Sequence, residues 1–279
     1  MNRIAGLREI VDQFDLFLVD QYGVLHDGVA AYPGAIDGLI KFTSHGRKIV
    51  VLTNSGKSSG ENRARLDALG FADSGFNAVV SSGDVALQRV KNGALGPGFL
   101  RGADICVIGR HGDSYAFSPD DFTLVDRPQD ATFLVFAGSD APRTSLDSYR
   151  SMLIAAAKAG VPGICVNPDL TMIRDGELVA APGTIARVYQ SLGGGVEYVG
   201  KPHRAIFEHA IATAATGPGA RAIMVGDSPE HDVAGASAIG LATLLVRTGI
   251  HCHLSEQQLL RFCEECNGVP DFLMTAFEW

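Results

Sequence analysis

The sequence predicts an α/β fold, a parallel sheet core with a second α/β unit inserted into it. Apolar runs that end in polar residues, at 16–20 and 50–55, alternate with helical patterns, as the strands of a buried parallel sheet do. A separate series of strand signals and a helix signal lies within residues 80–182. We therefore expect a core domain from residues 1–79 and 183–279 and an inserted α/β domain from residues 80–182.

The elements follow in order along the chain. In the first part of the core we expect a strand over Leu16–Val19, helices over 34–44 and 58–69, a strand over 50–55 between them, and a strand in GFNAVVSS at 75–82. In the inserted domain we expect strands at 105–109, 132–138 and 163–167 and a helix over 145–158. The core alternation resumes after residue 183.

Chemically useful side chains follow the core strands. Asp20 ends the first strand, and Thr53, Asn54 and Ser55 end the second. Lys201 follows later, before a helix-like stretch. Asp227 lies at another strand end, with Asp232 five residues after it. In an open α/β sheet the ligand site lies outside the carboxyl ends of the strands. A carboxylate nucleophile, hydroxyl and amide groups, an ammonium group and a carboxylate pair are what Mg²⁺-assisted phosphoryl transfer through an aspartyl phosphate requires.

These segments resemble the haloacid dehalogenase superfamily, and specifically its subfamily IIA phosphatases with a large cap. The resemblance rests on DGVLHDG-like, LTNSG, GKPHRAIFEHA, MVGDSPEHDVAGA and LLVRTGI segments, which extend over most of the chain. It implies a Rossmann-like core with a cap and a nucleophile at Asp20. It also implies phosphate contacts from Thr53, Asn54 and Ser55, charge neutralisation by Lys201, and Mg²⁺ held by Asp20, Asp227, the Tyr22 backbone carbonyl and Asp232.

The chain departs from that family at position 22, where Tyr22 stands in DQYG and the family's phosphatases carry a second aspartate. That aspartate acts as the general acid and base, a contribution of about 10² to 10⁴ in rate. A phenol with a pKa of about 10 is a poor base at neutral pH. Two interpretations of the next loop stay open: His26 or Asp27 replaces the missing group, or both serve the turn before Gly28.

In the inserted domain, NPDLT places Asn167 and Asp169 directly after an expected strand. The resemblance implies that this loop faces the substrate, so both are candidates for recognising the part of the molecule beyond the phosphate. The alternative is a simple Asn-Pro-Asp turn.

A second metal site is a further hypothesis. His251, His253, Cys263 and Cys266 offer ligand types that suit Zn²⁺, and Cys263 and Cys266 share a helix face. Against it, the spacing is not that of a zinc finger, and cysteines on a helix are commonly small core residues.

Composition limits the partners. The formal net charge is −8 with no basic run, which argues against nucleic acid and membrane partners. An odd number of cysteines, 5, is typical of a reducing compartment, and no signal peptide pattern is present, so we expect a cytoplasmic protein. A homo-oligomer is left open.

The sequence thus predicts an Mg²⁺-dependent phosphatase that acts on a small organic phosphate such as a sugar phosphate. Two alternatives remain at this stage. One is a protein that keeps the fold and binds a phosphorylated ligand or partner with impaired turnover, and the other is different chemistry on the same Asp20 carboxylate.

Overall fold

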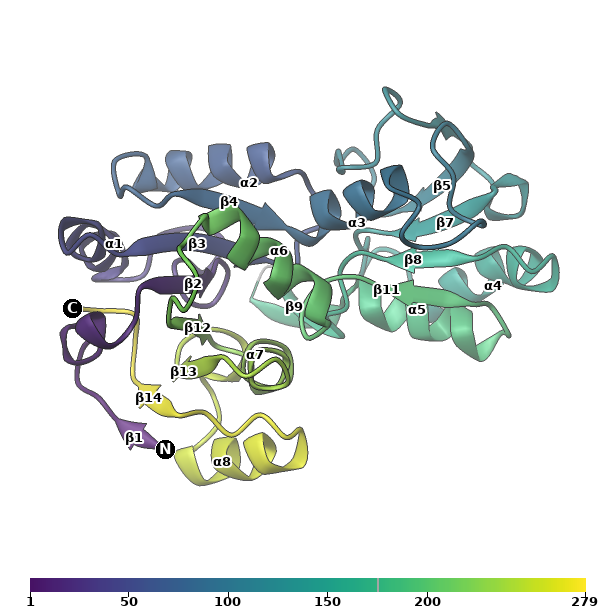
Figure 1. The fold of residues 1–279 in the computed structure, drawn as a ribbon. Helices are drawn as coiled ribbons and strands as arrows, with labels where there is room; N and C mark the ends of the chain where they lie inside the picture. The colour runs from purple at the N-terminus through teal and green to yellow at the C-terminus, as the bar shows by residue number, and fades with distance from the viewer. Residues whose placement is uncertain (175) are drawn as a thin grey trace. The chain divides into compact units, whose positions relative to one another are not determined.

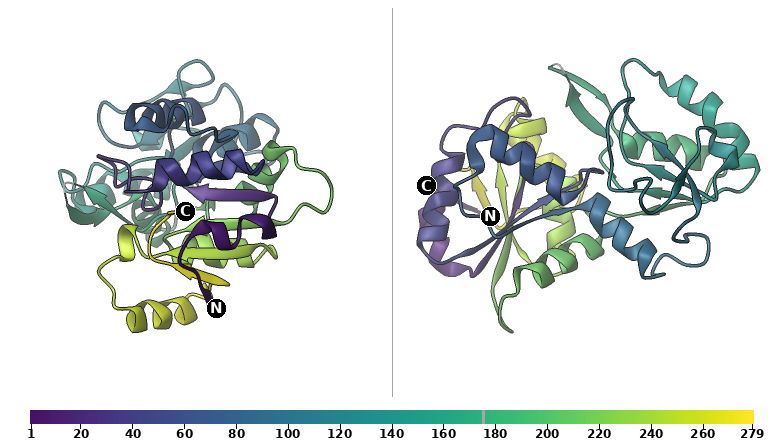
Figure 2. Two further views of the ribbon diagram at one scale, coloured as in Figure 1. Left: turned by 90° about the vertical axis from the view of Figure 1, so that its left-hand side faces the viewer. Right: turned by 90° about the horizontal axis from the view of Figure 1, so that it is seen from above.

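The structure is a computed structural model that describes residues 1–174 and 176–279. Its contacts divide the chain into two compact units. We call them the core unit, which comprises Met1–Thr53, Gly60–Val80 and Lys201–Trp279, and the inserted unit, which comprises Asn54–Ser59 and Ser81–Gly200. Figures 1 and 2 show the strands and helices of each unit.

The core unit is built on a seven-stranded sheet whose recorded strand pairs are all parallel. The strand order is β1 (Asn2–Arg3), β14 (Phe272–Met274), β13 (Ala242–Val246), β12 (Ala222–Gly226), β2 (Leu16–Asp20), β3 (Lys48–Thr53) and β4 (Ala78–Ser81). Since β2 lies between β12 and β3, the carboxyl ends of these three strands meet at one edge of the sheet. That edge positions the candidate site.

Alternate residues of the core strands pack on opposite faces. Phe17, Val19, Leu244 and Val246 join α1 (Ala35–Ser44) and the end of α2 (Ser59–Leu66) in the main hydrophobic core. Leu245 points to the other face, where it packs with α8 (Glu256–Glu265). The remaining helices of the core unit are α6 (Arg204–Ala214), α7 (Ala234–Ser237), the 3₁₀ turns Leu7–Glu9, Val11–Gln13 and Gly249–His251, and the π turns Asp67–Phe71 and Pro229–Val233.

The inserted unit has its own parallel sheet. Its order is β11 (Val196–Tyr198), β8 (Gly163–Cys165), β7 (Phe133–Phe136), β5 (Asp104–Ile108) and β6 (Thr123–Leu124). Helices α4 (Leu146–Lys158) and α5 (Pro182–Ser191) cover one face, where Leu153, Ile185 and Tyr189 pack on Leu134 and Phe136. The unit also contains α3 (Ser82–Lys91), a 3₁₀ turn at Pro128–Asp130 and the antiparallel hairpin of β9 (Thr171–Arg174) and β10 (Glu177–Ala180).

The α/β fold class is confirmed, and each strand and helix expected by residue range is present within a few residues. The domain division differs from the expected one. The expected return to the core at residue 183 falls inside α5, which packs in the core of the inserted unit, and β11 pairs with β8 of the same sheet. The chain therefore returns to the core unit at Lys201.

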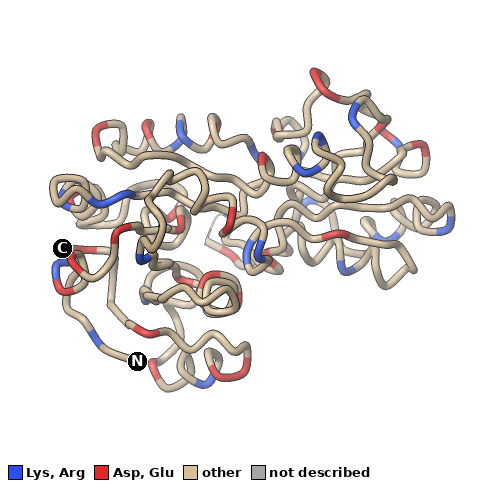
Figure 3. Tube along the Cα trace, in the orientation of Figure 1, with Lys and Arg blue, Asp and Glu red and all other residues tan. Residues whose placement is uncertain are grey.

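None of the described helices combines the length and the apolar character that a bilayer span needs. Lys and Arg are scattered among Asp and Glu along the trace of each unit (Figure 3).

Candidate active site

Three carboxylates gather at the carboxyl edge of the core sheet. Asp20 ends β2, Asp227 directly follows β12, and Asp232 lies in the π turn after it. One oxygen atom from each of the three lies within 4.8 Å of the others, and they form the one such group among the described residues. The carboxyl ends of neighbouring parallel strands lie at the same edge of the sheet. Acids at or just after these ends therefore come close together in the fold.

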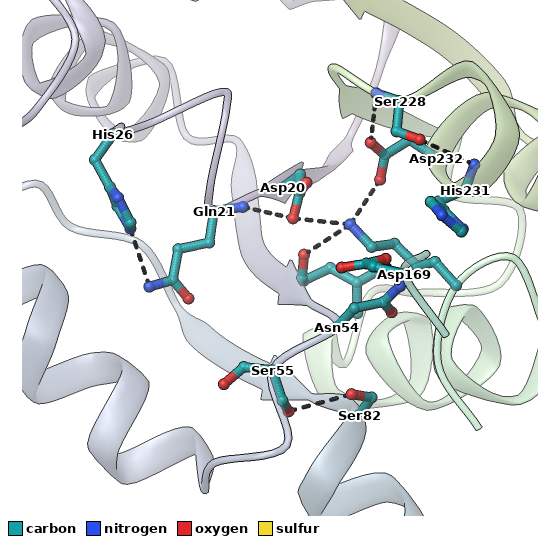
Figure 4. Close-up of polar contacts among 12 residues, drawn as sticks. Asp20, Gln21, His26, Asn54, Ser55, Ser82, Asp169, Ser228, His231 and Asp232 are labelled. Carbon is teal, nitrogen blue, oxygen red and sulfur yellow. Dashed lines mark hydrogen bonds and ion pairs between the residues drawn. The ribbon is translucent and has the colours of Figure 1, made fainter. Parts of the chain in front are cut away.

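Lys201 joins two of these acids. Its Nζ atom lies 2.8 Å from Asp20 Oδ1 and 2.6 Å from Asp232 Oδ1, and it donates to the Leu52 carbonyl at 3.4 Å (Figure 4). The lysine is 2% exposed. Burial acts to lower the pKa of Lys201, but the charges of Asp20 and Asp232 outweigh burial and raise that pKa above its ordinary value. The ammonium group is therefore charged at any physiological pH.

Backbone donors orient the carboxylates. The Gln21 N–H donates to Asp20 Oδ1 at 2.7 Å, the Ser228 N–H to Asp232 Oδ2 at 3.1 Å and the Ile250 N–H to Asp227 Oδ2 at 2.9 Å. Asp20 Oδ1 thus accepts from both Gln21 and Lys201, which fixes the rotation of its carboxylate. A side chain held by several hydrogen bonds is preorganised for attack or for ligation.

Two glycines make the approach to Asp227 possible. A Cβ atom at Gly23 would lie 2.3 Å from Asp227 Oδ2, and one at Gly249 would lie 1.9 Å from the same oxygen. Both glycines also have positive φ values, +87° and +75°. Thr248 Oγ1 donates to the Gly23 carbonyl at 2.5 Å and ties the two loops together.

The charge of this cluster suits a divalent cation. Burial raises the pKa of Asp20 to about 7 against the lowering effect of Lys201, and burial with the charges of Asp20 and Asp232 raises the pKa of Asp227 well above its ordinary range. Three carboxylates face one ammonium group here, so two negative charges are uncompensated when all are ionised. Oxygen ligands of this kind are those that Mg²⁺ and Ca²⁺ prefer.

His26 is buried, and its hydrogen bonds stabilise the loop that follows β2. It is 1% exposed, its Nδ1 accepts the Gly28 N–H at 2.9 Å, and its Nε2 lies 3.2 Å from the side-chain amide of Gln21. Because Nδ1 accepts this N–H, the neutral ring carries its proton on Nε2, the nitrogen that faces the Gln21 side-chain amide. Burial and the Arg65 charge lower the pKa of His26 to about 4. A neutral imidazole engaged on both nitrogens favours the loop interpretation over a general acid.

Asp27 also serves the turn: its Oδ1 accepts the N–H groups of Val29 and Ala30, each at 2.8 Å. These bonds lower the pKa of Asp27, the Ala30 bond most.

Tyr22 packs along the same loop. Its ring meets the His26 ring edge-on at 5.8 Å between centroids, and a Cβ atom at Gly28 would lie 3.0 Å from Tyr22 Cε2. Burial raises the pKa of Tyr22, and the charges of Asp27 and Asp227 raise it further. The phenol therefore stays protonated at neutral pH, so it can donate a hydrogen bond but cannot act as a base.

The expected phosphate-binding residues divide between the units. Thr53 is buried at the end of β3 in the core unit, where its neighbour Leu52 pairs with Asp20. Asn54 and Ser55 belong to the inserted unit. There Asn54 Nδ2 donates to Asp169 Oδ1 at 2.8 Å, and the Ser55 carbonyl accepts from Ser82 Oγ and from the Gly83 N–H. Asn167 Oδ1 accepts the Asp169 N–H at 3.1 Å.

The hypothetical zinc ligands have other contacts. His251 Nε2 lies 3.3 Å from both Glu230 oxygens, Cys263 is buried in the small core beside α8, and Cys266 Sγ donates to the Cys263 carbonyl. These contacts favour the core interpretation of the two cysteines. All five cysteines are free thiols.

Two protein-family models match the chain, and both describe the same family. A haloacid dehalogenase-like hydrolase model matches residues 17–122, and a second model described as HAD-hydrolase-like matches residues 198–266. All four acidic and basic residues of the site lie within the matched segments. The chain belongs to the haloacid dehalogenase-like hydrolases.

Similar proteins from two bacteria illustrate the family. D-glycerol 3-phosphate phosphatase from Mycobacterium tuberculosis is 28% identical over 88% of this chain, which spans 66% of that protein's length. The crystal structure of a haloacid dehalogenase-like hydrolase from Brucella suis is 27% identical, with a TM-score of 0.82 and coverage of 98% of this chain and 99% of that one. A structure of the M. tuberculosis glycerol phosphate phosphatase in complex with calcium is 25% identical, with a TM-score of 0.65 and coverage of 86% and 68%.

Several contacts at this candidate site were not predicted from the sequence. Gln21, Ser228 and Ile250 contribute through backbone N–H groups, which any residue type carries. Thr248 and Gly249 lie in the LLVRTGI segment, which is one of the segments that resemble the family. That resemblance is the feature of the sequence from which these two residues could have been predicted to lie at the site.

Proposed function

We propose that this hydrolase is an Mg²⁺-dependent phosphatase for a small organic phosphate, such as a sugar phosphate, with Asp20 as nucleophile. The observation that carries the proposal is the buried Lys201 between Asp20 and Asp232, with Asp227 beside them. Such a group combines a nucleophile, a fixed positive charge and ligands for a divalent cation.

In the proposed reaction an Asp20 oxygen forms a bond to phosphorus while the bond from phosphorus to the leaving oxygen breaks. Water then attacks the aspartyl phosphate, which releases orthophosphate and restores the Asp20 carboxylate. Lys201 holds Asp20 in place and opposes the negative charge of the transferred phosphoryl group. Thr53, Asn54 and Ser55 are proposed to bind the phosphate oxygens.

Asp20, Asp227, Asp232 and the Tyr22 backbone carbonyl would hold Mg²⁺, which supplies charge neutralisation when it is bound. The carboxylate donor set fits a hard divalent cation. The crystal structure of one relative, the mycobacterial glycerol phosphate phosphatase, in complex with calcium supports a divalent cation at this site.

The activity can be tested with a panel of small phosphate esters in the presence of Mg²⁺, with orthophosphate release as the readout. Asp20→Asn is the test variant, because the amide fills the same space and is a poor nucleophile. Asp147→Asn, an exposed acid in α4, is the matched control. Release by the wild type and the control, and none by Asp20→Asn, supports the proposal; equal release by all three contradicts it.

A second candidate function is the binding of a phosphorylated ligand with little turnover. Tyr22 favours it, because a phenol packed along the 26–28 loop cannot serve as a base. The same panel separates the two, since a binding protein would show saturable affinity for an ester that it fails to hydrolyse. A cytoplasmic location and the absence of nucleic acid and membrane partners stay predictions from composition.

A further inference from the structure

Two of the connections between the units pass beside residues of the proposed site. One boundary falls between Thr53 and Asn54, and another between Gly200 and Lys201. Thr53 and Lys201 are the core-unit residues at these boundaries, and each is joined by a peptide bond to a residue of the inserted unit, Asn54 or Gly200.

Within the inserted unit, a side-chain hydrogen bond to Asp169 orients Asn54. Its Nδ2 atom donates to Asp169 Oδ1 at 2.8 Å (Figure 4), and Asn54 is 5% exposed. A carboxylate only accepts hydrogen bonds, so the nitrogen end of the Asn54 amide must face Asp169. A hydrogen bond to a charged acceptor is about twice as strong as one between neutral groups.

The loop that carries Asp169 is itself fixed. Asn167 Oδ1 accepts the Asp169 N–H at 3.1 Å, and the Asp169 carbonyl accepts the Gly183 N–H from the first turn of α5 at 3.0 Å. Asp169 therefore presents its carboxylate from a rigid base, which is the condition under which one side chain can position another.

Gly200 packs against Asn54 and against Pro168 of the loop that carries Asp169. A Cβ atom there would lie 2.8 Å from Asn54 Oδ1 and 2.8 Å from Pro168 Cδ, and its φ is +123°. Close backbone approach and positive φ both call for glycine. The loop 167–169 thus contacts both connections, Asn54 by a hydrogen bond and Gly200 by packing.

We propose that Asp169 is a positioning residue that acts through Asn54. It orients the Asn54 amide and, through it, the Thr53–Ser55 segment that receives the phosphate. This inference rests on the proposed function and gives Asp169 a role different from the recognition of the leaving group that its sequence position suggested.

The test is a double-mutant cycle with Asn54→Ala, Asp169→Ala and the double variant, measured as kcat/KM for p-nitrophenyl phosphate with Mg²⁺. The kcat/KM of each single variant is expected to fall about 10- to 100-fold, because a small displacement of a group that binds the substrate has an effect of that order. If Asp169 acts through Asn54, the double variant matches Asn54→Ala within about threefold. If Asp169 contacts the substrate by itself, the two losses multiply, and the proposal is overturned.

Asp169→Asn, which keeps an acceptor oxygen at the same place, is expected to recover most of the loss seen in Asp169→Ala. Glu197→Ala, an exposed acid in β11 of the same unit, is the matched control and should retain wild-type activity. The calorimetric affinity for Mg²⁺ should not change in the Asp169 variants, because its proposed side-chain ligands lie in the core unit. A loss of Mg²⁺ affinity together with a lowered Tm in Asp169→Asn would mean a general structural role.

The same cycle measured as the Kd for orthophosphate with Mg²⁺ separates this inference from the proposed function. Orthophosphate binding with a non-additive cycle but no ester hydrolysis leaves the positioning role standing and overturns the phosphatase. If the wild type hydrolyses the ester and the losses of the two single variants multiply in the double variant, the phosphatase proposal stands and the positioning role of Asp169 is overturned. A wild type that neither hydrolyses the ester nor binds orthophosphate overturns both.

Discussion

Lys201 and Asp232 form a buried ion pair, with 2.6 Å between Nζ and Oδ1 and side chains that are 3% and 1% exposed. The other Asp232 oxygen, Oδ2, accepts the Ser228 N–H. The pair therefore fixes Lys201 so that its ammonium group also reaches Asp20. One cation thus contacts both the proposed nucleophile, Asp20, and a proposed metal ligand, Asp232.

Removing that cation should cost stability and activity together. In Lys201→Met the side chain keeps its length but Asp20 and Asp232 lose their partner, and breaking a buried pair costs about 3 to 5 kcal/mol. Urea unfolding in EDTA at neutral pH measures the loss. An unfolding free energy equal to that of the wild type would show that the pair is not a stabilising contact.

The two proposed metal ligands that follow β12 should behave differently. Asp227 Oδ2 accepts one backbone N–H, whereas both oxygens of Asp232 are engaged, by Lys201 and by Ser228. We expect Asp227→Asn to lose most of its Mg²⁺ affinity with little change in Tm, and Asp232→Asn to lower the Tm more because Lys201 loses a partner. Calorimetric titration and thermal melts of both variants check this, and the opposite order would contradict the assignment.

Stability should depend on pH and metal in a linked way. The folded-state pKa of Asp20 is raised to about 7 and that of Asp227 is raised well above 3.8, so between about pH 4 and pH 7 the folded protein binds more protons than the unfolded chain. Their contribution to the unfolding free energy therefore falls as pH rises through this range.

Bound Mg²⁺ offsets this loss of unfolding free energy at higher pH, because the cation takes the place of the protons on the Asp20 and Asp227 carboxylates. The Tm difference between protein with excess Mg²⁺ and protein in EDTA should thus be larger at pH 7.5 than at pH 5. Melts at these two pH values give the answer, and comparing each pH with its own EDTA control cancels the contribution of His26, whose pKa is lowered and acts in the opposite direction. A difference that shrinks toward pH 7.5 would contradict the carboxylate assignment.

Tyr22 gives a prediction about the leaving group. Without a carboxylic acid at this position, aryl phosphates should be hydrolysed well relative to alkyl phosphates of similar size, and the aspartyl phosphate should accumulate as a burst of product. Tyr22→Asp should raise alkyl phosphate turnover by up to about 10². Tyr22→Phe keeps the ring that packs on His26 and Gly28 and serves as the control. If Tyr22→Asp instead lowers the turnover of an alkyl ester that the wild type hydrolyses quickly, the tyrosine is an active part of the site.

The sequence predicted those parts of the site that strand ends determine. Asp20 and Asp227 follow apolar runs, and parallel pairing of β2 with β12 then brings them together without further information. The contact of Asn54 with Asp169 could not be predicted from pattern, because 115 residues separate them and the orientation of an amide depends on the packed loop. Nor could the boundary at Lys201, since α5 and β11 show the same helix and strand alternation as the core.

The central claim is that Asp20 becomes phosphorylated, and rapid acid quench with a ³²P-labelled phosphate ester tests it most directly. The wild type in Mg²⁺ should yield acid-stable labelled protein, with the label on the peptide that contains Asp20. The aspartyl phosphate should accumulate, because Tyr22 provides no base for its hydrolysis. Asp20→Asn should yield none. Orthophosphate release by the wild type without any labelled protein, or equal labelling of Asp20→Asn, would contradict the account.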